Sequence, residues 1–185
     1  MKRLIALMLC LILAASTLAA CQVEGGKEHS SAPVETEAPT EPDPYEDLVR
    51  YETSIGLSLY MTEGFTEGNV EGVQACYEGE NSNVRFQEET FASLASIGYG
   101  DVTELRDYAA LIQMAYSLEG EVLSDEYDNV YIYYEVDIQG TSISYYGFFD
   151  KGSEAFWMTT FMCMTAQKSQ FEEDFKLWAS SIQVP

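Results

Sequence analysis

Hydrophobic and polar residues divide the chain into three stretches of different character. Residues 4–18 are almost wholly apolar and follow two cations, Lys2 and Arg3. Residues 22–47 carry almost no bulky apolar side chain. From about Leu48 onward, aromatic and aliphatic residues become dense. This pattern predicts an N-terminal secretory signal, a polar connector and one folded C-terminal domain.

The strongest β-strand pattern of the C-terminal domain lies between residues 130 and 164. Three segments rich in β-branched and aromatic residues are separated by turn residues: Val130–Ile138, Thr141–Phe149 and Ala155–Met164. Gln139-Gly140 fits a tight turn, and Asp150–Ser153 fits the next one. On the first segment, alternation places Ile132, Tyr134, Val136 and Ile138 on one face and Tyr131, Tyr133, Glu135 and Asp137 on the other. We expect an antiparallel meander.

The remaining segments predict shorter strands and three helices. Strands are expected at Gly56–Met61, Val73–Tyr77 and Val84–Gln87, with a turn at Thr62–Phe65 and a short terminal strand at Ile182–Val184. Helices are expected at Glu88–Ile97, from a cap at Asp101 or Glu104 to near Gly120, and after a capping box at Ser169–Glu172. The last helix carries an apolar stripe of Phe171, Phe175, Trp178 and Ala179. The sum is an α+β fold, an antiparallel β-sheet meander with helices packed on it.

The residues that end the apolar N-terminal segment match a specific sequence motif. Leu18-Ala19-Ala20-Cys21 resembles the lipobox of bacterial lipoproteins, in which the cysteine takes a diacylglyceryl group and becomes the first residue of the mature chain. The resemblance implies a signal peptide over residues 1–20, lipidation of Cys21, and a protein anchored in the lipid bilayer at the extracytoplasmic face of the cell membrane. Two fatty chains suffice for stable anchoring. The alternatives are a secreted protein cut after Ala20 and an uncleaved anchor.

The connector over residues 21–49 is acidic and rich in proline. Such a composition cannot bury enough surface to offset its ordering entropy, so we expect a disordered tether. Its fully extended reach is roughly 90 Å for about 26 residues. Of 9 basic and 31 acidic residues, Lys2 and Arg3 leave with the signal, so the mature charge is about −24. This charge disfavours nucleic acid and favours a basic partner.

The order of elements in the domain resembles the PsbP-like family. The resemblance rests on Gly56–Tyr60 with Gly64-Phe65, Leu105–Tyr116, Ala155–Thr159, and Phe171–Phe175 through Trp178–Ile182, and covers roughly residues 50–185. It implies a PsbP-like α/β sandwich. It also implies a small, non-catalytic accessory or binding domain.

Candidate chemistry in the domain is sparse. The only histidine, His29, lies in the tether, which excludes a histidine-based triad or zinc site from the domain. Cys76 and Cys163 form no CxxC motif, so a metal cluster is not expected. Outside the cytosol these two cysteines can form a disulfide, or they can be separate buried thiols. No cofactor is implied.

Three further groups of residues have both a functional and a structural interpretation. Asp125–Asn129 is either a calcium-binding loop or a solvated turn. The pairs Glu88/Glu89 and Glu172/Glu173 are either acid–base catalysts or chance neighbours in an acidic chain. Tyr131 and Tyr133 are either a recognition surface for protein or glycan, or core residues.

These observations favour a membrane-tethered, non-catalytic binding or assembly module with a protein partner. A carboxylate-based hydrolase of wall or glycan material is the first alternative. A sensory or transport accessory that binds a small ligand is the second.

Overall fold

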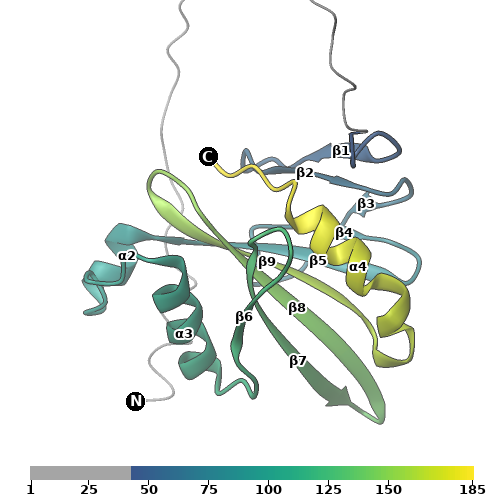
Figure 1. The fold of residues 1–185 in the computed structure, drawn as a ribbon. Coiled ribbons are helices and arrows are strands. Elements are labelled where there is room, and N and C mark those ends of the chain that lie inside the picture. Colours follow the sequence, from purple (N-terminus) through teal and green to yellow (C-terminus); the bar gives the residue numbers. More distant parts are fainter. Residues whose placement is uncertain (1–42) are drawn as a thin grey trace, which may run out of the picture. The chain divides into compact units, whose positions relative to one another are not determined.

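A seven-stranded antiparallel β-sheet forms the centre of the structure, a computed structural model that describes residues 43–185 (Figure 1). The segments predicted as signal peptide and tether, up to residue 42 and with Cys21 and His29, lie outside the described residues. The strand order is β3-β4-β5-β9-β8-β7-β6. The strands are β3 (Thr66–Glu67), β4 (Ala75–Glu78), β5 (Ser82–Thr90), β6 (Val122–Ser124), β7 (Val130–Ile138), β8 (Thr141–Lys151) and β9 (Ala155–Met164).

The predicted meander is confirmed in β7, β8 and β9. β7 and β9 have the predicted bounds. Gln139 and Gly140 join β7 to β8 with φ angles of 56° and 85°, as a two-residue hairpin turn requires. The last two residues of β8 pair with Trp157 and Phe156. The turn expected over Asp150–Ser153 is therefore wrong in its first half, because β9 still offers ladder partners there.

A separate two-stranded hairpin precedes the sheet. β1 (Val49–Glu52) pairs with β2 (Ser58–Met61) in antiparallel orientation, and only β2 is predicted from the sequence. β1 begins at the end of the segment assigned to the tether, and Tyr45 stacks on Tyr60 with ring centroids 5.4 Å apart. The folded unit runs from Tyr45 to Pro185, because aromatic packing holds residues that composition alone assigns to the connector.

The shorter strands differ from the sequence pattern mainly in length. β5 has nine residues instead of the expected four, because it pairs with β9 along its whole length. β3 and β6 have two and three residues and are not predicted, since such short segments carry no periodicity. At the C-terminus, the expected strand is reduced to one bridge between Ser58 and Gln183.

The first two α-helices begin at identifiable residues. α2 (Phe91–Ser96) is shorter than the expected 88–97, because Glu88–Thr90 continue β5. The Ser93 backbone N–H donates to Thr90 Oγ1 at 3.1 Å and so caps this helix. α3 (Leu105–Tyr116) follows Glu104, which makes no side-chain cap hydrogen bond.

The last helix begins earlier than expected. α4 (Lys168–Ala179) follows a 3₁₀ turn, η1 (Thr165–Gln167). The capping box expected at Ser169–Glu172 is wrong, since Ser169 already lies within the helix. Among residues 43–185, no helix combines the length and the hydropathy needed to cross a bilayer.

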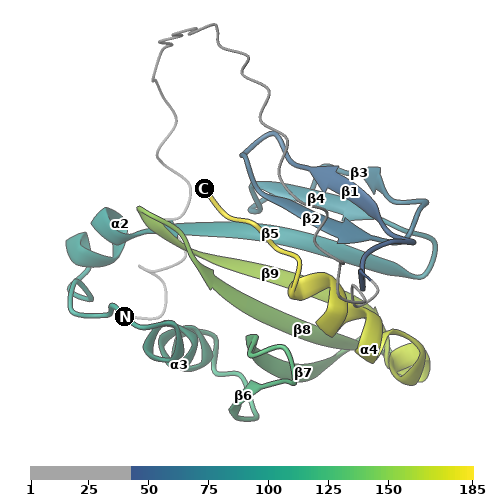
Figure 2. The same cartoon turned by 45° about the horizontal axis from the view of Figure 1, so that its top comes forward.

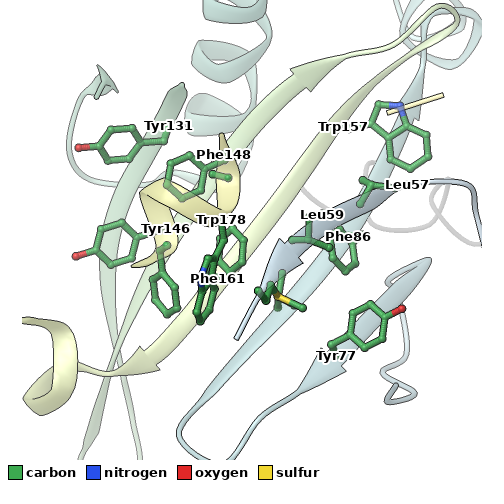
Figure 3. Packing of buried hydrophobic residues seen from close by; sticks show 14 of the residues in the cluster. Leu57, Leu59, Tyr77, Phe86, Tyr131, Tyr146, Phe148, Trp157, Phe161 and Trp178 are labelled. Carbon is green, nitrogen blue, oxygen red and sulfur yellow. The ribbon is translucent and has the colours of Figure 1, made fainter. Parts of the chain in front are cut away.

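The helices cover opposite faces of the sheet (Figures 1 and 2). α4 and the β1–β2 hairpin pack on one face, and α2 and α3 pack on the other. The predicted stripe of α4 is confirmed, with Phe175, Trp178 and Ala179 buried. Figure 3 shows Trp178 beside Phe161 in this core, with ring centroids 6.0 Å apart. The chain is an α+β protein, as predicted.

Replacing Phe175 by alanine should destabilise the fold strongly. Phe175 is fully buried and contacts the rings of Phe161 and Tyr146 at 5.1 and 5.6 Å. We expect Phe175→Ala to lower the free energy of unfolding by about 3–5 kcal/mol in urea titration of the full chain. Phe171→Ala, one turn earlier and only partly buried, is the matched control with a smaller loss. Equal losses would contradict this account of the core.

Candidate binding surface on the sheet

The two helix-covered faces of the sheet are unequally protected. α3 covers Ile132 on β7, which is 1% exposed. Val136 and Ile138 lie on the same face of the same strand and are 39% and 49% exposed. A 12-residue helix is about 18 Å long, whereas an 11-residue strand such as β8 spans about 37 Å. α3 therefore shields only the part of this face nearest its own axis.

The uncovered part carries apolar side chains in register on three strands. Val136 on β7 pairs with Ile143 on β8, which pairs with Met164 on β9. In the next row, Tyr134 pairs with Tyr145. We call this surface the open sheet face, defined by Tyr134, Val136, Ile138, Ile143, Tyr145 and Met164. Its members are exposed or half-buried.

Two stacked tyrosines form the inner border of the open sheet face. The rings of Tyr134 and Tyr145 lie 5.0 Å apart and are parallel within 1°. Burial raises the pKa of Tyr134 to about 12, and the neighbouring Tyr145 and Tyr116 add to the shift. Tyr134 is therefore a neutral phenol at physiological pH. The pair offers ring surface and hydroxyl groups to a partner rather than charge.

The two tyrosines singled out by sequence lie on the opposite face. Tyr131 is buried and stacks on Phe148 with centroids 5.2 Å apart, and Tyr133 is half-buried against Tyr146 at 4.8 Å. Of the two interpretations of Tyr131, the core residue is confirmed and the recognition surface is wrong, because α4 packs over that face. The alternation along β7 carried the correct signal, since it grouped Tyr134, Val136 and Ile138.

Tyr133 belongs to a polar border of the α4 face. The Lys168 ammonium lies 3.9 Å from its ring centroid. Its hydroxyl hydrogen-bonds to Glu135, and it lies 3.3 Å from Ser144 Oγ. Tyr133 is therefore occupied by contacts within the domain.

The disulfide between Cys76 and Cys163 is not formed, and both residues are buried free thiols. β5 lies between their strands, where Cys76 pairs with Arg85 and Cys163 with Ser82. Positions an odd number of residues apart on one strand face opposite sides of a sheet. The two thiols therefore point to opposite faces, two strands apart.

The acidic loop over residues 125–129 closes on itself. Asp125 accepts hydrogen bonds from the backbone N–H groups of Tyr127 and Asn129 and from Asn129 Nδ2 at 2.8–3.0 Å. This is the geometry of a turn organised by its first aspartate. Residues 43–185 contain no group of three or more histidine, cysteine or acidic side chains placed to hold a metal ion.

The two glutamate pairs do not converge on a common site. Glu88 and Glu89 are neighbours on β5 and point to opposite faces. Glu172 and Glu173 both contact the Lys176 ammonium, at 3.7 and 2.9 Å. The hydrogen bond to Lys176 lowers the pKa of Glu173. The ion pairs with Lys176 give Glu172 and Glu173 a structural role on the surface of α4.

Asp150 is the titratable group with the most unusual environment. It lies on β8 opposite Trp157, whose buried indole N–H has no hydrogen-bond partner among the described residues. Burial raises the pKa of Asp150 to about 7. Glu88 pairs with Trp157 from the other side, so Asp150 and Glu88 lie on β8 and β5, with β9 between these two strands.

A shallow hollow of about 10 Å³, room for roughly one water molecule, is lined by residues of β4 and β5 that include Cys76 and Arg85. Sites for small ligands ordinarily enclose about 300–1,000 Å³. The hollow is thus too small to hold such a ligand as it stands.

Comparison with known proteins gives structural likeness only. No family model and no curated protein matches the chain. Among solved structures, it is similar to cyanobacterial PsbP (CyanoP) from Synechocystis sp. PCC 6803, with a TM-score of 0.49 and 14% identity over 75% of this chain and 93% of the other. A protein from Bacteroides thetaiotaomicron VPI-5482 gives a TM-score of 0.44 and 7% identity over 70% of this chain and 45% of the other. At these values the likeness carries nothing about activity, partners or site residues.

Asp150 should make stability depend on pH. Its folded-state pKa of about 7 exceeds the ordinary value of 3.8, so the folded chain holds this proton more tightly than the unfolded chain. Its contribution to the free energy of unfolding therefore falls as pH rises from about 4 to about 7. We expect Asp150→Asn to remove this fall and to exceed the parent by up to about 4 kcal/mol above pH 7.

Urea titrations between pH 4 and pH 8 measure this effect. Asp101→Asn, at an exposed carboxylate, is the control and should follow the parent curve. Parallel curves for the Asp150→Asn variant and the parent would contradict the assignment.

Proposed function

We propose that this protein is a membrane-tethered, extracytoplasmic lipoprotein that acts as a non-catalytic binding or assembly module, with the open sheet face as its partner site. The observation that carries the proposal is the register of exposed Val136, half-buried Ile143 and exposed Met164 across three strands, without a covering element among the described residues.

Exposure of a contiguous apolar surface to water is unfavourable in free energy. Single exposed apolar residues are ordinary, but contiguous patches on monomers mark interaction sites. The patch lies on β7, β8 and β9, and the opposite face of these strands packs against α4. The patch therefore rests on a rigid support. A rigid apolar surface loses little conformational entropy when a partner covers it.

The charge of the chain narrows the chemistry of the partner. Acidic residues outnumber basic ones 31 to 9 over the sequence. Such a field repels nucleic acid and anionic lipid headgroups and accelerates encounter with a cationic protein. We therefore propose a protein partner with a basic rim around an apolar centre.

The lipobox resemblance supplies the location of this surface. A diacylglyceryl group on Cys21 anchors the chain, and the acidic segment of about 24 residues between Cys21 and Tyr45 can place the domain up to roughly 85 Å from the bilayer. A surface held at this distance suits a partner in or beyond the material next to the membrane.

A charged side chain on the open sheet face should abolish capture of the partner. We expect Val136→Lys to reduce recovery of crosslinked partner from intact cells by at least about tenfold, because the lysine must be desolvated on binding. Val49→Lys is the matched control, since Val49 also lies on a strand and is 41% exposed against 39% for Val136.

The same comparison can be repeated with isoleucines. Ile138→Lys should lose capture while Ile97→Lys retains it, although the two side chains are 49% and 46% exposed. Equal recovery from both members of each pair would reject the open sheet face as the partner site.

Removing the lipidated thiol should release the protein from the membrane. We expect Cys21→Ser to shift the chain from the membrane fraction to the unanchored fraction, because no diacylglyceryl group can form. Mass spectrometry of the mature parent should find a lipid adduct on Cys21. An unmodified Cys21 on membrane-bound protein would contradict the anchor.

A further inference from the structure

The outer edge of β7 is only partly paired. β6 pairs with Val130–Ile132 and no further, although β7 continues to Ile138. Figure 1 shows β6 beside only the first part of this strand. The final four residues, Glu135–Ile138, are all exposed. They form an open strand edge directly beside the open sheet face.

The hairpin turn decides which backbone groups this edge presents. Ile138 and Thr141 are the pair that closes the two-residue turn, and such a pair exchanges hydrogen bonds across the hairpin. Alternate residues of β7 therefore direct their N–H and C=O groups toward β8. The backbone groups of Glu135 and Asp137 consequently point outward, as does the Tyr133 carbonyl, which lies near Gly120.

The acidic and the apolar side chains of this strand edge lie on opposite faces of the sheet. Glu135 and Asp137 are exposed on the α4 side, and Val136 and Ile138 are exposed on the open sheet face. A strand added here would meet carboxylates on one side and an apolar surface on the other. Charge complementarity then calls for basic residues alternating with apolar ones.

We infer that the partner adds an extended segment of alternating basic and apolar residues to the edge of β7, as a further strand of the sheet. This inference rests on the proposed function and specifies how its surface is used. The backbone groups of Glu135 and Asp137 supply the ladder, and the apolar residues of the segment lie over Val136 and Ile138.

Two other occupants are disfavoured by charge. A second copy pairing through β7 would bring Glu135 and Asp137 opposite their own counterparts, and like charges opposite each other destabilise a ladder. The acidic tether of the same chain would meet the same repulsion. Charged residues at an exposed edge commonly prevent such self-pairing.

The test uses an end-blocked peptide of eight alternating lysine and valine residues, added to isotopically labelled protein. We expect amide shifts concentrated in β7 and slowed hydrogen exchange at the Glu135 and Asp137 amides. An alternating glutamate–valine peptide should bind at least about tenfold more weakly. A peptide with four lysines followed by four valines, which has the same composition, should also lose binding.

Two changes, one in the peptide and one in the protein, remove the backbone hydrogen bonds between them and leave the charges of the peptide in place. The alternating peptide methylated on every second backbone nitrogen should not bind. Glu135→Pro removes an outward N–H and should abolish binding, whereas Glu135→Gln, which keeps the N–H, should weaken it only partly. Hydrogen exchange within β7 and β8 checks that the proline variant keeps its hairpin.

The outcomes separate this inference from the proposed function. Binding that survives backbone methylation, or shifts elsewhere than β7, overturns strand addition. The absence of binding by any peptide overturns it as well, as does a dimer formed through β7 or protection of β7 by the tether. If Val136→Lys still loses the cellular partner in those cases, the open sheet face stands and only its mode of use is wrong.

Discussion

The architecture depends on a mismatch between the length of the strands and the length of the helices that cover them. α3 and α4 each have 12 residues, about 18 Å, while β8 and β9 extend well beyond that. On one face, the β1–β2 hairpin and the C-terminal segment complete the cover that α4 begins. On the other face, α3 and α2 cover only the half nearest α2, and apolar side chains remain in water.

The two faces therefore divide stability from recognition. On the covered face, aromatic rings pack closely against one another. The ring centroids of Phe161, Phe175 and Trp178 lie 5.1–6.0 Å apart. Such packing fixes the sheet as a rigid plate, because dense interiors tolerate little rearrangement. The open sheet face and the edge of β7 can then present apolar side chains and backbone groups at defined positions.

The local sequence pattern was sufficient for some elements and insufficient for others. Val130–Ile138 and Ala155–Met164 were predicted with correct bounds because long alternation and clear turn residues define them. β1, β3 and β6 were not, because so few residues form a strand only where a neighbour supplies a ladder. The candidate site could also be predicted only in part. Alternation assigns the residues of β7 to two faces, but the packing of the helices decides which face is covered. The sequence pattern therefore leaves Tyr131 open between a surface and a core position, and it does not single out Tyr134.

Oxidative footprinting of methionine in intact cells tests the central claim most directly. Met164, on the open sheet face, and Met114, on the outer side of α3, are 45% and 63% exposed in the chain alone. If the open sheet face is covered by a partner, Met164 oxidises much more slowly in cells than in purified protein, while Met114 changes little. Equal oxidation of Met164 in cells and in purified protein would contradict the account.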